Sequence, residues 1–400
     1  MKKNFIVFCA CLLVFCIVFA VSCTKKDAVE KLTVWIYDSG RIEALTEIGK
    51  KFEAEYGIPV EVSLVDLTQV RNQFLLASGG PECADLAIIP HDNIGPLVEN
   101  GMILEVNLGD KRGDFLEPAL AGFSYNGRLY GVPIAVENIG FFYNPELVPV
   151  PPETWDEAVR ITEELKRQGR VEYMFGCPDA TYNMYPVYDS FGGSIFGKNP
   201  DGSLDGTDIL IAERGFVQGL EFLANMVRRG LIPETIDWES AHVLFESGKV
   251  PFAFTGPWAL PRFKTSGVPY VITTFPGARR GQPGNPFLGV QGVIVSSVSP
   301  RRLLANTFAV EYIATEENML ALSLAEGRPS AWRSIFETSG DADTLGFNSA
   351  GVNAVPMPSV PQMGHVWDAW EAAAALAFSR ERPAMAALQN AKAQIESLSK

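Results

Sequence analysis

Histidine and cysteine are scarce in this sequence, which limits the chemistry that it can carry. The three histidines among 400 residues, His91, His242 and His365, are far apart, and none has the spacing of metal ligands. Four of the six cysteines lie within the first 23 residues, which leaves Cys83 and Cys177, too few for a disulfide framework. We therefore expect no metal and no cofactor. The two remaining thiols are expected to be buried, although a bond between them in an oxidising compartment stays open.

Basic side chains are also in short supply. Without residues 1–22, the chain has 31 lysines and arginines against 47 aspartates and glutamates, a net charge of about −16. The phosphates of nucleic acids demand clustered lysine and arginine, so this balance argues against a nucleic-acid partner. The apolar share of 47% and the charged share of 20% are those of an ordinary globular protein. We expect a soluble chain whose ligand is neutral or cationic.

The N-terminus carries the longest apolar run. Two lysines precede Phe5–Ser22, and Cys23 follows directly after small residues. A charged start, an apolar middle and a small-residue end predict a signal peptide over residues 1–22. Cys23 resembles the lipidated cysteine of bacterial lipoproteins, which makes 23–31 a lipid-bearing tether. The alternative is an uncleaved anchor, because 18 residues come near the length that spans a bilayer. Either way, the folded part is expected in the periplasm or on the cell surface, attached to the membrane.

Strands and helices alternate after this segment. Leu32–Tyr37 has the pattern of a strand, and apolar residues at helical spacing follow from Ile42 until Gly57 ends the helix. The alternation continues with strands at Ile58–Val65 and Ala84–Ile89, a helix at 67–78, and a helix that Asp92 caps and Gly101 ends. Later elements are expected as an Asn126-Gly127 hairpin turn, helices at 155–168, 212–229, 239–247 and 300–314, a strand at Val250–Phe254 and two amphipathic helices after Pro356. Such alternation predicts an α/β protein with parallel βαβ units.

A single carboxylate, Glu137, separates two apolar runs within Gly131–Pro145. A buried lone carboxylate is costly unless it is paired or hydrogen-bonded. We interpret this segment as a strand that leaves one lobe and enters another, with Glu137 at the mouth of the cleft between them. The alternative is a core strand whose one acid points to water. Pro286–Ser297 is expected to return, and 400 residues suit two lobes better than one core.

Five sequence blocks carry a family resemblance. They are KLTVWIY (31–37), GKKFEAEYGIPVEV (49–62), GVPIAVENIGFFYNPELVPVPPETWDEA (131–158), TGPWAL (255–260) and VPQMGHVW (360–367). In this order they resemble segments of maltose/maltodextrin-binding proteins, the sugar-capturing subunits of ABC importers. The resemblance implies a two-lobe periplasmic-binding-protein fold with crossing hinge strands near 135–139 and 287–292 and a ligand cleft between the lobes.

The same resemblance implies a division of the chain and a set of partners. One lobe would comprise 32–136 with 292–340, and the other 137–291 with 341–400. Hinge closure would bury the ligand, which contacts both lobes only in the closed state. The implied partners are an oligosaccharide of the maltose or maltodextrin kind, the transmembrane permease subunits of an ABC importer and, through the lipid on Cys23, the membrane. The implied state is a monomer.

Aromatic side chains beside turns are candidates for sugar stacking, because flat rings pack against the C–H surface of a pyranose. Tyr182, Trp258 and Trp367 occupy such places, although each taken alone fits a core as well. All three coincide with aromatic sugar-stacking positions of the resembled family. Met357 coincides with a further family contact, with simple packing as its alternative.

Carboxylates supply strong acceptors for sugar hydroxyls. The resemblance assigns this role to Asp92, which follows His91 as in the family, and to Glu137 on the crossing strand. Asp179 lies near a second-lobe acid of the family, in a segment that differs in length. Asp38, just after the first strand, is the last candidate.

Several family residues of the cleft are absent from this chain. Ser39 and Gly40 stand where the family has a lysine, Asn93 and Glu371 where it has arginines, and Ile89 where it has a tryptophan. The resemblance therefore supports the two-lobe architecture more strongly than it supports a particular ligand, and specificity for linear maltodextrins stays open.

Three functions compete at this point. The resemblance favours the solute-binding component of an ABC sugar importer, which is not an enzyme. Acids in an aromatic cleft could instead belong to an extracellular glycoside hydrolase, although no two acids here stand as a plausible acid–nucleophile pair. A purely structural surface lipoprotein would bind no ligand. We expect the binding protein.

Overall fold

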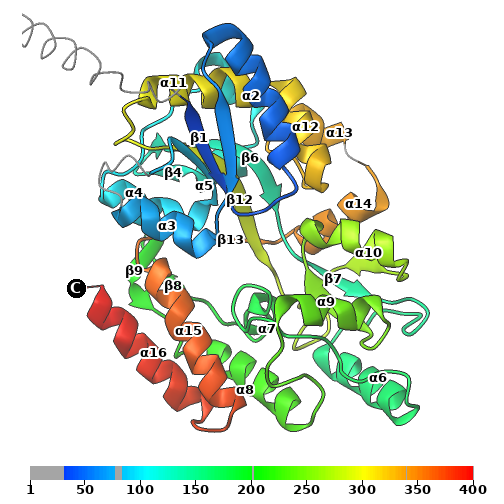
Figure 1. Cartoon of the computed structure of the whole chain (residues 1–400). Coiled ribbons are helices and arrows are strands. Elements are labelled where there is room, and N and C mark those ends of the chain that lie inside the picture. Colours follow the sequence, from blue (N-terminus) through cyan, green and yellow to red (C-terminus); the bar gives the residue numbers. More distant parts are fainter. Residues whose placement is uncertain (1–30, 77–82, 201, 339, 400) are drawn as a thin grey trace, which may run out of the picture.

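The computed structural model describes residues 31–76, 83–200, 202–338 and 340–399, so the expected signal peptide, Cys23 and nearly all of the tether lie outside the described residues. Figure 1 shows two α/β lobes, one above the other, with β12 and the β6–β7 segment running between them. Within the described ranges, no helix is both long and apolar enough to cross a membrane.

The upper lobe is built on a six-stranded sheet of order β13-β12-β3-β1-β2, in which β6 also pairs with β12. Strand β1 is parallel to β2 and to β3, which confirms the predicted βαβ units, whereas β12 is antiparallel to both β3 and β6. The strands are β1 (Leu32–Ile36), β2 (Val60–Leu64), β3 (Leu86–Pro90), β6 (Val132–Glu137), β12 (Phe287–Val295) and β13 (Val355–Pro356), with the hairpin β4 (Ser124–Tyr125) and β5 (Arg128–Leu129). The helices are α2 (Ile42–Tyr56), α3 (Leu67–Leu76), η1 (His91–Asn93), α4 (Ile94–Glu99), η2 (Gly109–Asp114), α5 (Glu117–Gly122), α11 (Arg302–Thr307), η4 (Phe308–Ile313), α12 (Glu316–Glu326) and α13 (Arg333–Thr338).

Helix α2 shows how the local sequence produces this packing. Ile48 and Phe52 are buried against the sheet, as their helical spacing predicts. Gly49 lies on the same face, and a Cβ there would come within 2.8 Å of the Cβ of Val60, so glycine lets α2 lie this close to β2. Gly57 ends the helix with a φ of 70°, the left-handed conformation expected of a C-terminal glycine.

The lower lobe is organised around a three-stranded antiparallel sheet of order β10-β7-β11. Its strands are β7 (Gly140–Tyr143), β10 (Phe252–Thr255) and β11 (Val271–Thr273), with a separate hairpin of β8 (Phe196–Lys198) and β9 (Leu204–Ile209). Its helices are α6 (Trp155–Arg167), α7 (Tyr185–Ser190), α8 (Arg214–Arg228), α9 (Trp238–Glu246), η3 (Pro257–Ala259), α10 (Leu260–Ser266), α14 (Ala342–Ala350), α15 (Met363–Phe378) and α16 (Ala384–Leu398).

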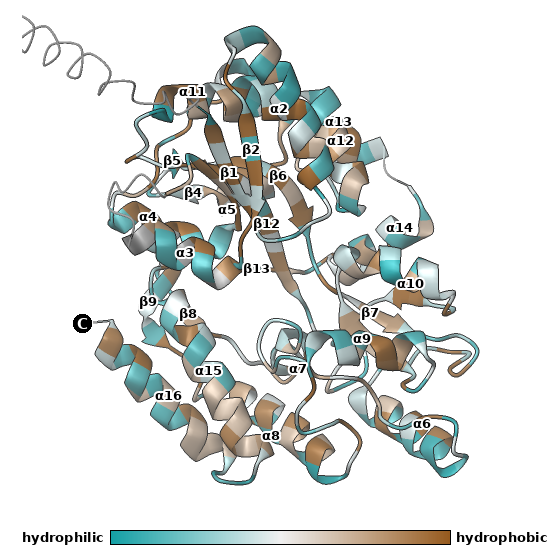
Figure 2. Cartoon of the chain, in the orientation of Figure 1, coloured by the Kyte–Doolittle hydropathy of each residue, from teal (hydrophilic) through white to brown (hydrophobic). Residues whose placement is uncertain are grey.

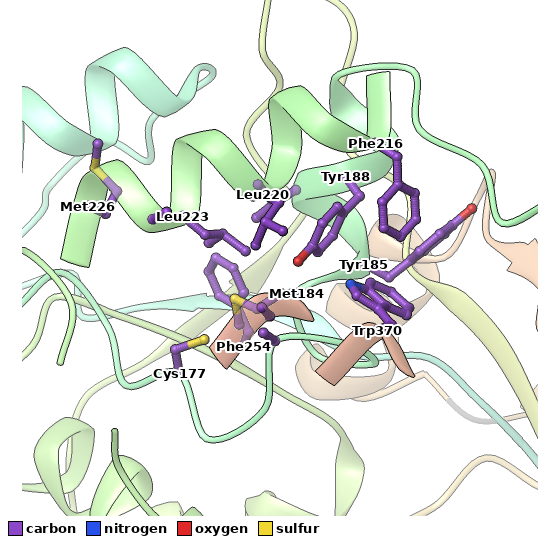
Figure 3. Close-up of a cluster of buried hydrophobic side chains, with 14 of the residues drawn as sticks. Cys177, Met184, Tyr185, Tyr188, Phe216, Leu220, Leu223, Met226, Phe254 and Trp370 are labelled. Atoms are coloured by element: carbon purple, nitrogen blue, oxygen red, sulfur yellow. The ribbon is translucent and has the colours of Figure 1, made fainter. Parts of the chain in front are cut away.

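Aromatic rings from three helices fill the centre of the lower lobe. Figure 3 shows Tyr188 of α7, Phe216 of α8 and Trp370 of α15 packed around one another. The Tyr188 ring centroid lies 4.5 Å from that of Phe216 and 4.9 Å from that of Trp370, the latter pair edge to face. These contacts bring the two C-terminal helices onto the lobe, because α15 and α16 both pack on α8.

Each lobe has its own apolar core. Figure 2 shows the apolar residues concentrated on the strands and on the inward sides of the helices. Along the chain, one core gives way to the other between Val136 and Ile139, between Phe287 and Val290, and between Ile335 and Phe347. The lobe boundaries expected at 136/137, 291/292 and 340/341 remain a prediction, because they divide the chain into two lobes that are expected to move relative to each other.

Three local expectations need correction. The helix expected at 300–314 is α11 followed by the π-helical turn η4. Asp92 caps no α-helix: it lies inside η1, and Asn93 is the N-cap residue of α4. Cys177 is buried as expected, but Cys83 is only partly buried, and both thiols are free.

Candidate functional site

A cleft of about 1330 Å³ separates the two lobes. The upper lobe contributes residues that follow the carboxyl ends of β1 and β3, the hinge contributes the end of β6, and the lower lobe contributes η3, α15 and the loop before α7. Residues that follow parallel strands meet at one sheet edge, which is why distant segments converge here. The cleft is lined by all eight candidate residues: Asp38, Asp92, Glu137, Asp179, Tyr182, Trp258, Met357 and Trp367.

The aromatic candidates surround the base of the cleft. The ring centroids of Tyr182 and Trp258 lie 6.4 Å apart at an interplanar angle of 40°. Phe287 at the start of β12 lies 6.1 Å from Tyr182 and 6.0 Å from Trp367, and so connects the two sides. Rings that are partly buried can offer an apolar face to a ligand while the rest of the side chain packs against the core of the lower lobe.

Asp179 shapes the wall that carries Tyr182. Its Oδ1 accepts hydrogen bonds from the backbone N–H groups of Thr181 and Asn183, each at 3.1 Å, and the amide of Asn183 donates to Oδ2. Burial raises the pKa of this carboxyl, an effect that these donors oppose. The aspartate therefore closes a tight turn that holds Tyr182 at the cleft.

Glu137 is buried and paired, so the alternative in which it points to water is wrong. Its side chain is 7% exposed. Gln291 of β12 donates to its Oε1 at 2.8 Å, and the Arg328 guanidinium binds Oε2 as an ion pair. The carboxylate thus joins both crossing strands, β6 and β12, to the segment that follows α12.

A second arginine extends this cluster. Arg41 lies 3.2 Å from Glu326 and donates to Gln291 at 2.6 Å, and Asp38 lies 4.0 Å from it. Burial lowers the pKa of Arg41 to about 10, and Arg328 acts in the same direction. Burial is the largest single influence on Arg328 and disfavours its charge, but Glu137, Tyr37 and Asp38 together outweigh it and raise the pKa of Arg328. Two guanidinium groups and three carboxylates therefore form one cluster of ion pairs beside the cleft.

Asp92 reaches across the cleft. Trp367 of α15 donates from Nε1 to Asp92 Oδ2 at 3.1 Å, and Asn93 donates to Oδ1 at 2.9 Å. The Trp367 bond joins the two lobes directly. Met357 contributes differently, since its side chain belongs to the lower core while its carbonyl oxygen accepts from His91.

His91 is a neutral support beneath Asp92. The Val290 N–H donates to its Nδ1 at 3.0 Å, so Nε2 carries the proton and donates to the Met357 carbonyl at 2.9 Å. Burial lowers the pKa of His91 to about 4, against 6.5 in an exposed side chain. The imidazole therefore links η1 to β12 without a charge.

This depressed pKa predicts an acid-sensitive fold. Between pH 6.5 and 4 the unfolded chain binds the His91 proton and the folded chain does not, so stability from this group is full above pH 6.5 and falls by about 3 kcal/mol as the pH drops through 4. Urea denaturation at several pH values should show a shallower loss in His91→Gln. Equal pH slopes in both proteins would contradict this expectation.

The family departures fall in different places. Ser39, Gly40 and Asn93 line the cleft, but Ile89 is buried in the upper core. Glu371 lines a separate hollow of about 600 Å³ beside Cys177. Its carboxylate accepts from the Ala180 N–H at 3.1 Å, and burial raises its pKa.

Sequence reasoning missed five residues of the site: Tyr37, Arg41, Gln291, Glu326 and Arg328. Tyr37 could have been found, because it stands beside Asp38 at the same strand end. The other four carry no local signal, since each has a partner in the cluster that is far away in the sequence, as Arg328 has in Glu137 and Glu326 has in Arg41. Among the described residues, no cluster of three or more histidine, cysteine or acidic side chains could hold a metal ion.

Comparisons with known proteins agree with this geometry. A family profile described as bacterial extracellular solute-binding protein matches residues 47–343. The maltotriose binding protein of Thermus thermophilus, solved with maltotriose bound, superimposes with a TM-score of 0.83 at 30% identity, over 92% of this chain and 100% of that one. This similarity confirms the expected two-lobe fold.

Curated relatives cover nearly the whole chain as well. The galactooligosaccharide-binding protein of Bacillus subtilis is 28% identical over 92% of this chain and 90% of its own length. A maltooligosaccharide ABC transporter solute-binding lipoprotein of Streptococcus pneumoniae is 25% identical over 86% of this chain and 82% of its own.

Proposed function

Because this chain belongs to the bacterial extracellular solute-binding proteins, we propose that it captures an oligosaccharide in the interlobe cleft and delivers it to the permease of an ABC importer. The proposed ligand is a glycan of the maltose or maltodextrin kind. Lipid on Cys23 would attach the protein to the membrane, and the chain would act as a monomer. The role as a non-catalytic solute-binding protein follows from the family itself.

One observation carries the proposal: aromatic faces and carboxylate acceptors converge on the same cleft from both lobes. Tyr182 and Trp258 supply ring faces from below, and Asp38 and Glu137 supply carboxylates from the upper lobe and the hinge. A pyranose presents both an apolar C–H face and hydroxyl groups, so it matches both surfaces at once. A ligand seated there touches both lobes, which couples binding to closure.

The geometry gives no support to the hydrolase alternative. A glycosidase needs one carboxyl to act as acid and another to act as base or nucleophile. Asp38 and Glu137 instead share the guanidinium of Arg328. Both are suited to accepting hydrogen bonds, and the family is non-catalytic.

The choice of glycan is the finer part of the proposal. The relatives' names mention maltooligosaccharide, maltotriose and galactooligosaccharide. Ser39, Gly40 and Asn93 line the cleft where the resembled family has cations, so a different set of hydroxyl contacts is expected. Maltodextrins come first in our proposal, and galactooligosaccharides are the second candidate.

A titration tests the function directly. Residues 24–400 would be mixed with maltose, maltotriose, galactooligosaccharides and other sugars, and binding followed by tryptophan fluorescence and calorimetry. We expect saturable binding of one glycan class with no release of free sugar. Tight binding of a different sugar would keep the importer role and change the ligand. If no sugar of the panel changed the fluorescence or released heat on mixing, oligosaccharide binding would be rejected.

A further inference from the structure

We propose that Arg328 is a positioning residue of the cleft, which holds the acceptor carboxylates of Asp38 and Glu137 in place and anchors Trp258 from the opposite lobe. The inference rests on the proposed function, since it explains how the cleft is kept ready for a glycan. Arg328 lines the cleft itself, but its side chain is 4% exposed, so its charge is directed at neighbouring residues.

The edge of the guanidinium is occupied by three carboxylates. Nη1 binds Glu137, Nη2 lies 3.5 Å from Asp38, and Nε lies 2.6 Å from Glu326 as an ion pair without hydrogen-bond geometry. These acids come from the hinge, from the end of β1 and from the end of α12. A planar fork can satisfy several acceptors in fixed directions, which a lysine ammonium cannot.

The same guanidinium lies over an aromatic ring of the other lobe. The Arg328 Cζ lies 5.2 Å from the ring centroid of Trp258, within the range of a cation–π interaction. Trp258 belongs to η3, next to β10 of the lower lobe. Arg328 therefore connects the acceptor carboxylates to a candidate stacking surface, and it does so across the cleft.

The backbone around Arg328 is held rigidly. Gly327 adopts a φ of 66° at the end of α12, which turns the chain sharply toward β6. Beyond Arg328, the Val136 N–H donates to the Pro329 carbonyl at 3.0 Å, and the Ala331 N–H donates to the Ile134 carbonyl at 3.1 Å. The segment thus runs along β6 and delivers the guanidinium to Glu137 with little freedom. Groups that are fixed before binding need not be ordered when the ligand arrives.

Arg328→Met tests the inference, because it keeps the length of the side chain and removes the charge. Arg301→Met is the matched control: Arg301 also pairs with a buried acid, Asp85, at 3.2 Å, but near the start of β3 rather than at the cleft end. In the full-length chain, purified in detergent, calorimetry with maltotriose and with galactooligosaccharides should show roughly 30-fold weaker binding for Arg328→Met. Arg301→Met should lower the melting temperature with binding unchanged.

Arg328→Lys should fall between the wild type and Arg328→Met, because it keeps the charge without the fork. It also carries the test where Arg328→Met does not fold. Wild-type affinity in a folded Arg328 variant would overturn the inference, as would an equal loss of affinity in Arg301→Met.

A second measurement needs no ligand and so separates this inference from the proposed function. The tryptophan emission of the ligand-free protein should change in Arg328→Met, and the change should vanish in a Trp258→Phe background. If the wild type binds no sugar but this difference is present, the proposed function fails and the anchoring of Trp258 stands. An emission spectrum identical to the wild type would overturn the anchoring.

Discussion

Replacing Glu137 with alanine is expected to lower the free energy of unfolding by about 3–5 kcal/mol. The change removes the ion pair to Arg328 and the acceptor of Gln291, and both partners are almost completely buried. A buried guanidinium that loses a charged partner keeps the cost of its lost hydration and loses part of the compensation. Urea denaturation at neutral pH measures the loss directly.

Two further variants make this result specific. Glu137→Gln retains an acceptor and the size of the side chain, so we expect a smaller loss than for alanine. Glu61→Ala removes an exposed ion pair with Lys31, which should cost less than about 1 kcal/mol. A loss for Glu137→Ala as small as that for Glu61→Ala would show that the buried cluster contributes little to stability.

Replacing Trp258 with alanine is expected to weaken glycan binding by about 2–3 kcal/mol, roughly 30- to 150-fold. The indole lies in the cleft beside Tyr182 and below the guanidinium of Arg328, so its removal takes away an apolar face and the cation–π contact of that guanidinium. Calorimetry with the best glycan from the sugar panel measures the change.

The control for this variant is a tryptophan outside the cleft. Trp35 of β1 packs edge to face on Phe74 at 5.8 Å and belongs to the upper core. Trp35→Ala should cost stability and leave the affinity of the folded protein unchanged. If both tryptophan variants lost affinity equally, or if neither did, Trp258 would not be a stacking residue.

The predictions for Glu137 and Trp258 both depend on the charged residues of the cleft. Positions 39, 40, 93 and 371 lack the cations of the resembled family, and from the sequence the cleft looks short of positive charge. The structure places Arg41 and Arg328 beneath the acceptor acids instead, each paired with carboxylates. The cleft therefore contains positive charge, but both guanidinium groups form ion pairs with carboxylates of the protein itself.

Local patterns sufficed for most of the secondary structure. The helical spacing that ends at Gly57, the Asn126-Gly127 hairpin with φ values of 48° and 76°, and the start of α6 at Trp155 all match expectation. Such signals are local because a helix or turn depends on side chains a few residues apart. The capping role of Asp92 failed for a related reason: a short η1 turn precedes α4, and no local pattern distinguishes the two starts.

The two-lobe architecture, the family and eight of the side chains that line the cleft could be predicted from the sequence. The contacts of those side chains depend on the tertiary fold. Arg328 is 191 residues from Glu137, Arg41 is 250 from Gln291 and Trp367 is 275 from Asp92. Partners at such separations are set by strand register and by the crossing of β6 and β12 between the lobes, which no periodicity encodes. A carboxylate predicted to need a partner was therefore recognisable from the chain, whereas the identity of that partner was not.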